Sequence, residues 1–342
     1  MPNLQAEGMS KTSIPTGIGA LAALSSLVVH GFWTMRELPA GISSLRALTC
    51  LRLGDSWSLR ELPQDISHLK ALRHIDFSKC RKLGELPPGI SAFACLTTLR
   101  LSWCEALRTL PAGISALTGL TSLDLGHCHS LTQLPEGISA LTALARIAIG
   151  ARQHLTELPE GISALSALSY IDLHSSYGLE QLPAGICALT DLRHLGLSCC
   201  SGLRELPAGI GALTALTKLD LSCCDRLKQL PAGISGLSGL TSLTMDRCEA
   251  LTELPMSISA FTTLSSIELA HCHSLRELPA GISALTALTY LSLFYCDGLR
   301  EPSGLSLLTA LRKLDISGCT QLKHLPLALS SLTQLEIEGA YQ

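Results

Sequence analysis

The chain has 342 residues, a length that ordinarily corresponds to two or three domains. Its 25 lysine and arginine residues and 28 acidic residues give a net charge of −3, which argues against nucleic acid as the main partner. It contains no run of about 18 apolar residues, which argues against a membrane-spanning helix.

At the amino terminus, residues 1–13 (MPNLQAEGMSKTS) are polar and fall outside the repeat described below. We expect this segment to be disordered or frayed, as chain ends usually are. Residues 14–29 are apolar and follow a lysine, a pattern that a cleaved signal peptide or an anchor also shows. Because Pro15, Ile18 and Leu27 occupy the same positions as in later repeats, we interpret this segment as the first repeat.

From residue 14 onward, one unit of 24 residues recurs. A fixed period of this size indicates a solenoid, in which each unit is stable only against its neighbours. We therefore expect residues 14–342 to form a single elongated domain. Proline marks the period, with one interval of 23 residues before Pro302: Pro15, Pro39, Pro63, Pro87, Pro111, Pro135, Pro159, Pro183, Pro207, Pro231, Pro255, Pro279, Pro302 and Pro326.

The unit from Leu110 to Gln133, LPAGISALTGLTSLDLGHCHSLTQ, shows the pattern of all the repeats. The alternation in Leu123–Leu125 predicts a short strand with one buried face. Ile114, Leu117 and Leu120 are spaced by three, which predicts a helical or 3₁₀ turn on the opposite side. Stacked units would bury these leucines against each other and place the strands side by side in a parallel sheet.

The pattern LxxLxLxxC, as in Leu120, Leu123, Leu125 and Cys128, followed by LxxLPxxIxxL, resembles the leucine-rich repeat family over roughly residues 14–340. The 24-residue length, the turn cysteine and the LPxGI segment are most similar to the repeats of plant intracellular disease-resistance receptors. The resemblance implies an α/β solenoid, or horseshoe, of about 14 repeats. It would carry a parallel β-sheet on the concave face, short helical or 3₁₀ turns on the convex face, and a concave surface that binds another protein.

Fourteen cysteines are present, and nine of them share one repeat position. We interpret this column as a structural ladder, in which each thiol packs as a small apolar group and donates weakly to a neighbouring turn carbonyl. Ladder side chains stacked in parallel about 5 Å apart do not match the shorter Cβ separation of a disulfide. So many free thiols indicate a reducing, cytoplasmic compartment. The ladder comprises Cys80, Cys104, Cys128, Cys200, Cys224, Cys248, Cys272, Cys296 and Cys319.

Two further cysteines, Cys199 and Cys223, stand next to ladder positions on adjacent repeats. They are the one thiol pair that we single out for oxidation. The alternative is that they are two ordinary surface thiols.

Several places interrupt the repeat. Arg152 stands where a ladder cysteine is expected. Because burial of an unpaired guanidinium is costly, we predict that Arg152 turns outward and distorts its turn. Ser176 also replaces a ladder cysteine, and the unit that contains Pro302 lacks one residue, which predicts a local offset. The last unit, at residues 329–337, is three residues short, and we interpret it as a weak carboxy-terminal cap.

Catalytic motifs are missing from the sequence: it has no GxxxxGK[ST] loop, no HExxH and no GxSxG. His127–His129 and His271–His273 have the His-Cys-His pattern of possible metal ligands. They lie six repeats apart, about 29 Å by strand spacing, and cannot share an ion. Zinc requires three or four converging ligands. We therefore predict no enzymatic activity, no metal and no cofactor.

The residue between the two strand leucines forms a polar column along the predicted sheet. Arg52, Asp76, Arg100 and Asp124 alternate in charge about 5 Å apart, which predicts a ladder of exposed ion pairs. Such a column is either a solvated, self-neutralised face or a charged recognition strip.

Aromatic residues make up only 4% of the chain, yet many fall on the predicted strand face or the turn beside it. Exposed tyrosine and tryptophan are frequent anchors of protein interfaces, and shielding of the turns is the alternative role. The first interface patch that we predict comprises Tyr290, Phe294 and Tyr295, with His271, Lys313 and Asp315 on neighbouring repeats. The second comprises Trp57, Asp76, Arg100 and Trp103.

The sequence as a whole predicts a non-catalytic scaffold that binds a protein partner through the concave face, as a monomer and with no nucleic-acid or membrane partner. By resemblance, its role would be in defence or signalling regulation. Two alternatives stay open. One is a bacterial leucine-rich-repeat effector or ubiquitin-ligase adaptor that captures a host protein. The other is an orphan structural array, which the near-identical recurrence of GISALTAL favours.

Overall fold

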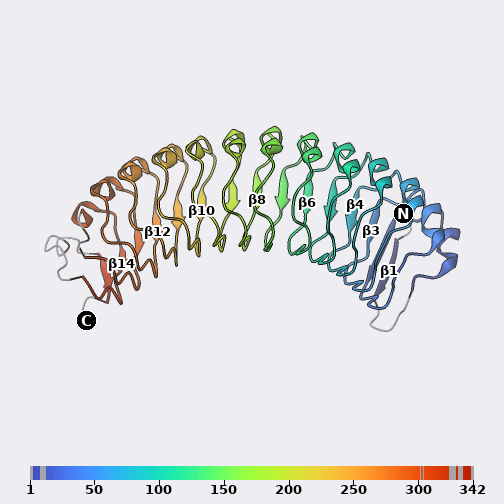
Figure 1. Ribbon diagram of the computed structural model, residues 1–342, viewed down its shortest axis with the longest axis horizontal. Helices are drawn as coiled ribbons and strands as arrows, with labels where there is room; N and C mark the ends of the chain where they lie inside the picture. Colours follow the sequence, from blue (N-terminus) through green and yellow to red (C-terminus); the bar gives the residue numbers. More distant parts are fainter. Residues whose placement is uncertain are drawn as a thin grey trace. The chain divides into compact units, whose positions relative to one another are not determined.

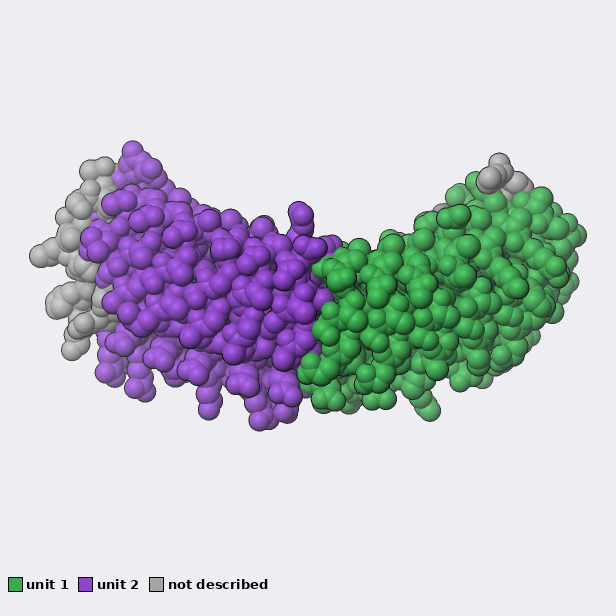
Figure 2. Space-filling model, turned by 90° about the horizontal axis from the view of Figure 1, so that it is seen from above, with its two compact units in different colours: residues 1–168 green, residues 169–342 purple. Residues whose placement is uncertain are grey.

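The computed structural model describes residues 3–7, 13–300, 302, 304–322, 329 and 334–339. The chain divides into two compact units, residues 1–168 and residues 169–342 (Figure 2). The boundary falls just before a strand and does not change the 24-residue period. Our expectation of a single solenoid domain therefore remains a prediction, and each unit is described by itself.

Unit 1 contains a parallel sheet whose strands pair in sequence order. Most of its strands are three residues long, and each middle residue is buried while its neighbours face outward. The strands are β1 (Asn3–Glu7), β2 (Ser26–His30), β3 (Cys50–Arg52), β4 (His74–Asp76), β5 (Thr98–Arg100), β6 (Ser122–Asp124) and β7 (Arg146–Ala148).

The first strand corrects an expectation from the sequence. Residues 3–7 were expected to lie in a frayed segment, but they form β1 and pair with β2 from Asn3↔Ser26 to Glu7↔His30. Leu4 lies beside Leu27, so the strand continues the leucine column of the sheet one step further. Residues 1–2 and 8–12 of the expected segment lie outside the described residues.

Unit 2 repeats the arrangement, and its strands also pair in parallel and in sequence order. The missing residue near Pro302 leaves the strand register intact, because Tyr290 pairs with Lys313 only 23 residues later. The strands are β8 (Tyr170–Asp172), β9 (His194–Gly196), β10 (Lys218–Asp220), β11 (Ser242–Thr244), β12 (Ser266–Glu268), β13 (Tyr290–Ser292), β14 (Lys313–Asp315) and β15 (Glu336–Glu338).

Short 3₁₀ turns follow the repeat prolines and return the chain to the next strand. Within each unit, Figure 1 shows these turns as a row of coils on one side and the strand arrows side by side on the other. Spacing by three suits 3₁₀ geometry: the amides of Ile114, Leu117 and Leu120 donate to the carbonyls of Pro111, Ile114 and Leu117 at 2.9–3.0 Å. The predicted parallel strands and 3₁₀ turns are thus confirmed.

The 3₁₀ turns within the described residues are η1 (Thr16–Ala20), η2 (Ala40–Ser44), η3 (Gln64–His68), η4 (Pro88–Ala92), η5 (Ala112–Ala116), η6 (Glu136–Ala140) and η7 (Glu160–Ala164) in unit 1. Those in unit 2 are η8 (Ala184–Ala188), η9 (Ile210–Ala212), η10 (Ala232–Gly236), η11 (Met256–Ala260), η12 (Ala280–Ala284) and η13 (Leu305–Leu307). The shortened η13 begins after Gly304, whose φ of 79° absorbs the local loss of one residue before β14. The expected offset is thereby confined to this turn. Of the predicted carboxy-terminal cap, residues 330–333 lie outside the described residues.

Leucine and isoleucine side chains fill the space between the strands and the 3₁₀ turns. In the repeat around β6, Ile114, Leu117, Leu120, Leu123 and Leu125 are all fully buried. Burial of a side chain of this size contributes roughly 1.5–3 kcal/mol relative to exposure. Because each repeat covers the leucines of the next, the stability of a repeat depends on its neighbours.

The cysteine column closes the core at the turn after each strand. Each of its nine thiols donates to a backbone carbonyl one repeat earlier, at Sγ–O distances of 3.0–3.5 Å. Cys128, for example, donates to Leu101 and Cys200 donates to Leu173. Burial raises the pKa of the Cys200 thiol to about 12 because the thiolate would lose its hydration.

Arg152 contradicts our prediction that it would turn outward. The side chain is fully buried in the cysteine column, and Nη2 donates to the carbonyl oxygen of Leu125 at 3.0 Å. This carbonyl is 27 residues earlier, as it is for most of the ladder thiols, so the arginine takes over an acceptor that the ladder already provides. The prediction was wrong because it treated the buried guanidinium as having no partner at all.

Candidate recognition face

Two sets of exposed side chains accompany the core. The first and third residues of each strand face away from the leucines, and together with the second residue after each strand they form what we call the strand face. The residues immediately before and after each ladder position form two columns on the turn, which we call the inner and outer turn columns. The sequence-predicted interface residues are distributed over these surfaces.

The inner turn column has an unusual backbone. Its residues adopt a left-handed conformation, with φ between 55° and 63°, although they are not glycines. In this conformation the backbone amide reaches the next repeat at ten of these positions; the amide of Trp103, for example, donates to the carbonyl oxygen of Gly126 at 2.8 Å. The column comprises Asp55, Lys79, Trp103, His127, Ala151, Ser175, Cys199, Cys223, Arg247, His271 and Tyr295.

In unit 2, part of the first predicted patch forms a compact aromatic cluster. The rings of His271 and Tyr295 stack with centroids 5.3 Å apart, and Phe294 packs edge-on against both. Tyr295 remains 48% exposed because one side of its ring faces solvent. His273 joins the cluster at 5.9 Å from His271. The structure thus brings together three of the predicted residues and adds His273.

Tyr290, Lys313 and Asp315 lie elsewhere on the strand face. Tyr290 begins β13, four residues before Phe294, and within the described residues no ring contact joins it to the cluster. Lys313 pairs with Glu338 on β15 at 2.8 Å, and this hydrogen bond raises the pKa of the lysine. Glu338 is therefore a partner that sequence reasoning missed, since it lies in a shortened last repeat.

In unit 1, the second predicted patch separates into two aromatic groups. Trp103 stacks on His127 with centroids 3.8 Å apart, and His129 meets Trp103 edge-on. Trp57 instead stacks on Trp33 at 5.1 Å. The two tryptophans belong to different turn columns, Trp103 to the inner and Trp57 to the outer, so they join different aromatic groups.

A cation completes the group around Trp57. The guanidinium of Arg81 lies 5.2 Å from the centre of the Trp57 ring, and its Nε is 3.5 Å from the carboxylate of Glu105. Three side chains of the outer turn column, on successive repeats, are thus held in contact: Trp57, Arg81 and Glu105.

The alternating charges of unit 1 form one ion pair rather than a ladder. Arg100 and Asp76 approach to 3.9 Å, whereas no ion pair joins Arg52 to Asp76 or Arg100 to Asp124 among the described residues. The aspartates have another role: Oδ1 of Asp76 accepts the amide of Ser78 at 3.0 Å. The same bond, two residues along the chain, is made by Asp124, Asp172, Asp220 and Asp315. The acidic column thus stabilises the strand ends, which weakens the case for it as a recognition strip.

The strand face of unit 2 carries a concentration of acidic groups. Burial raises the pKa of Asp246, and repulsion from Asp220 adds to the effect. Burial likewise raises the pKa of Glu268, with further contributions from Asp246 and Asp220. Asp246 lies at the second residue after β11, outside the polar column that the strand pattern predicts, so the sequence did not reveal this acidic group.

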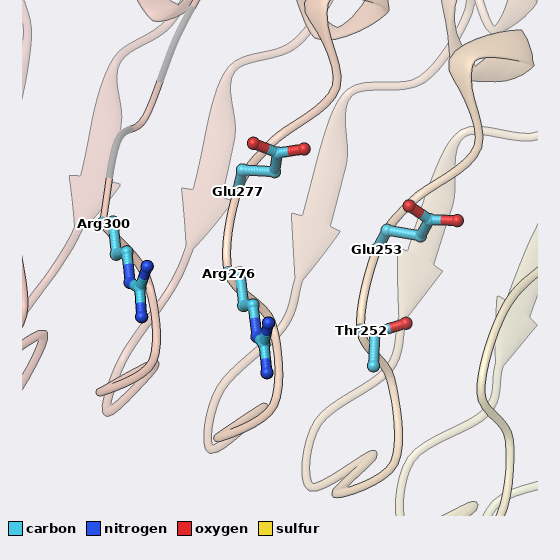
Figure 3. Close-up of a pocket in the computed structure, with 5 residues that line it drawn as sticks. All are labelled: Thr252, Glu253, Arg276, Glu277 and Arg300. Carbon is cyan, nitrogen blue, oxygen red and sulfur yellow. The ribbon is translucent and has the colours of Figure 1, made fainter.

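A hollow of about 530 Å³ lies beside the segments that lead from the turn to the next proline, and it is lined by Thr252, Glu253, Arg276, Glu277 and Arg300. All five residues are exposed. Figure 3 shows the two arginines pointing one way and the two glutamates the other. The described residues contain no group of three potential metal ligands, and His127, from one of the His-Cys-His segments, has its ring stacked on Trp103.

The fold and the repeat define a protein of the leucine-rich-repeat class. A family model described as a leucine-rich repeat region matches residues 149–249 and 184–274. The described residues have the fold of leucine-rich-repeat proteins, and part of unit 2 together with the end of unit 1 matches the family model. No curated protein matches it in sequence. The described residues contain no helix with the length and apolar character that crossing a membrane requires.

Solved structures show the same fold. A leucine-rich-repeat protein of Leptospira interrogans is 22% identical, with a TM-score of 0.66 over 98% of this chain and 95% of that one. The functional domain of InlJ from Listeria monocytogenes, described as including a cysteine ladder, is 23% identical, with a TM-score of 0.62 over 94% and 66%. The leucine-rich repeat domain of the type III effector XopL is 27% identical, with a TM-score of 0.55 over 66% and 82%.

Proposed function

We propose that this protein is a non-catalytic scaffold in the cytoplasm that binds a protein partner through the strand face and inner turn column of unit 2. The observation that carries the proposal is the cluster of His271, Phe294 and Tyr295. Aromatic residues with one exposed side supply large contact areas at a low entropic cost, and they are enriched among the residues that dominate interface energies. The fourteen free cysteines support the cytoplasmic location.

The chemistry next to the cluster indicates what kind of partner it suits. Asp220 and Asp246 lie close enough to Glu268 to repel it, and this repulsion adds to burial in raising the pKa values of Asp246 and Glu268. A basic segment of the partner would relieve this repulsion, while the aromatic cluster would accept an apolar or cationic side chain. We therefore expect a partner with a basic and partly apolar surface.

Site-specific crosslinking tests the proposal. A photo-reactive amino acid at position 295 should capture a protein from an extract of the source organism, whereas the same amino acid at Met256 on η11 should not. Met256 is a matched position because it is 62% exposed but lies on the 3₁₀ side of unit 2. Equal capture at both positions would contradict the proposal.

Binding of the captured partner, once purified, provides the second step. The double variant Tyr290→Ala and Tyr295→Ala should weaken binding by about 30-fold or more, as expected for interface anchors. Its melting temperature should stay close to that of the original chain, because both side chains are partly exposed. Met256→Ala provides the control, and unchanged affinity in the double variant would contradict the proposed interface on the strand face and inner turn column of unit 2.

A second candidate is an effector that captures a protein of a host. The observation that favours it is the 27% identity to the leucine-rich repeat domain of a type III effector. A plant-type role in defence or signalling rests only on the similarity of the LPxGI repeats. Crosslinking in an extract of a host cell and in an extract of the source organism distinguishes an effector from a scaffold that binds a protein of its own cell. An effector should capture a protein only in the host extract.

A further inference from the structure

Cys199 and Cys223 occupy the inner turn column on adjacent repeats, after β9 and β10. β9 and β10 are in register at Leu195↔Leu219, and the parallel pairing continues into the turn. There the amides of Cys199 and Cys223 donate to Ser222 and Asp246 at 2.6 and 2.7 Å. Their φ angles of 58° and 56° are nearly equal, so the two Cβ atoms project in the same direction.

Neighbouring side chains in the inner turn column contact each other elsewhere in the chain. Lys79 and Asp55 form an ion pair at 3.2 Å. The rings of Trp103 and His127 stack at 3.8 Å, and those of His271 and Tyr295 at 5.3 Å. Adjacent strands place their Cα atoms about 4.8 Å apart, which lies within the Cα range of disulfide-bonded cysteines. A bond also requires the Cβ atoms to close to about 3.8 Å, a small shift that is open to half-buried turn residues but not to the packed ladder. Column geometry therefore brings the two thiols into each other's reach.

The thiols are also accessible, since both side chains are only half-buried, unlike Cys200 and Cys224 in the ladder beside them. The pKa of Cys223 is raised to about 11, first by burial and then by the charge and hydrogen bond of Cys199. This interaction agrees with direct contact between the two groups. It also disfavours the Cys223 thiolate as the first attacking sulfur.

The geometry points to an oxidation site at Cys199 and Cys223, where a small-molecule disulfide such as oxidised glutathione converts the two thiols into a disulfide between adjacent repeats. The Cys199 thiolate attacks one sulfur of the small disulfide, which breaks its S–S bond and releases one thiol. Cys223 then loses its proton and attacks the Cys199 sulfur of the mixed disulfide, which releases the second thiol. Two protein thiols are oxidised and one small disulfide is reduced, so electrons and protons balance.

Mass spectrometry of the intact full-length chain after treatment with oxidised glutathione tests this inference. The chain should lose two hydrogen atoms, and trypsin should then release residues 194–204 linked to residues 219–226. Fragmentation should place the bond between Cys199 and Cys223 and not between the ladder residues Cys200 and Cys224. Dithiothreitol should reverse the change.

Variants separate this site from general thiol reactivity. Cys199→Ser and Cys223→Ser should each abolish the linked peptides, whereas Cys95→Ser, at an exposed cysteine on another surface, should leave them unchanged. The double variant Ser175→Cys with Cys223→Ser moves the pair one repeat earlier and should link position 175 to Cys199. Glutathione retained separately on Cys199 and Cys223, or a bond to a ladder cysteine, would overturn the inference.

Discussion

Nη2 of Arg152 donates to the carbonyl oxygen of Leu125 at 3.0 Å, in the position that a ladder thiol would occupy. Cys128, one repeat earlier, makes the equivalent bond to Leu101 at 3.1 Å. The remaining polar atoms of the guanidinium, Nε and Nη1, have no hydrogen-bond partner among the described residues. Burial lowers the pKa of Arg152 to about 10, because the charged form loses hydration that one carbonyl replaces only in part.

Arg152→Cys should therefore stabilise the protein. A cysteine would keep the hydrogen bond to Leu125 and remove a buried cation, and we expect the free energy of unfolding to rise by roughly 1–3 kcal/mol. Urea unfolding followed by circular dichroism measures the change. Arg108→Cys, at an exposed arginine, provides the control and should stay within about 0.5 kcal/mol. A loss of stability in Arg152→Cys would show that the guanidinium has a favourable role in the core.

The cysteine ladder should make the protein sensitive to alkaline pH. Burial raises the pKa of Cys248 to about 12 from an ordinary value of 9.0, so the folded chain retains a proton that the unfolded chain releases between these values. The contribution of this thiol to the free energy of unfolding is therefore fully present below pH 9. It falls as the pH rises toward 12, by about 1.4 kcal/mol per pH unit for one such thiol.

Unfolding free energies measured between pH 8 and 11 test this dependence, with Cys248→Ser as the comparison. Serine does not titrate in this range, so the variant should lose less stability per pH unit than the original chain. Arg152 acts in the opposite direction: its lowered pKa means that the unfolded chain binds the extra proton, so its contribution to stability rises from pH 10 to 12.5. Identical slopes in the variant and the original chain would refute a titrating role for Cys248.

Ser175→Gly should stabilise unit 2. Ser175 has a φ of 56°, and glycine adopts this left-handed conformation without the steric cost of a Cβ atom. We expect a gain of up to about 1 kcal/mol, partly offset by the greater freedom of glycine in the unfolded chain. The control is Ser201→Gly, two positions after Cys199 and without a positive φ, which should be neutral or destabilising. Differential scanning calorimetry measures the melting temperature of both variants. A lower melting temperature for Ser175→Gly than for the original chain would contradict the prediction.

Gly233→Ala should destabilise the packing of η10 on η9. A Cβ atom at Gly233 would lie against the carbonyl oxygen of Ala208, a backbone atom that cannot move without shifting the turn. Overpacking of this kind typically costs about 1–3 kcal/mol. Gly17→Ala is the matched control in η1, because no atom lies within 4 Å of the added Cβ. Equal melting temperatures for the two variants would mean that the turns of unit 2 can separate at little cost.

The architecture could be predicted from the sequence because one local pattern determines it. Leucines at alternate positions, such as Leu123 and Leu125, specify a strand with one buried face, and those spaced by three specify a 3₁₀ turn. Neither inference depends on distant parts of the chain. The cysteine column was visible for the same reason, since stacked repeats place equivalent residues beside each other.

The candidate site was less predictable, because its geometry depends on a backbone conformation that leaves no mark in the sequence. Left-handed residues are usually glycine or asparagine, but this column contains tryptophan, histidine and tyrosine at Trp103, His271 and Tyr295. Their conformation decides which rings stack, so Trp57 could not be assigned to its partner Trp33 beforehand. The aspartates were misjudged for a related reason: Asp76 bonds to the backbone two residues along, a contact that charge alone does not reveal.

The left-handed turn also lets the residues of the inner turn column change in evolution independently of the leucine core. Its amide bonds to the next repeat whatever the side chain is, so the residue at this position is free of the demands that the leucine interior makes. A family of such chains could exchange charged, aromatic and thiol groups here, one repeat at a time, while the hydrophobic interior stayed the same. Diversity among relatives should then be greatest in this one column.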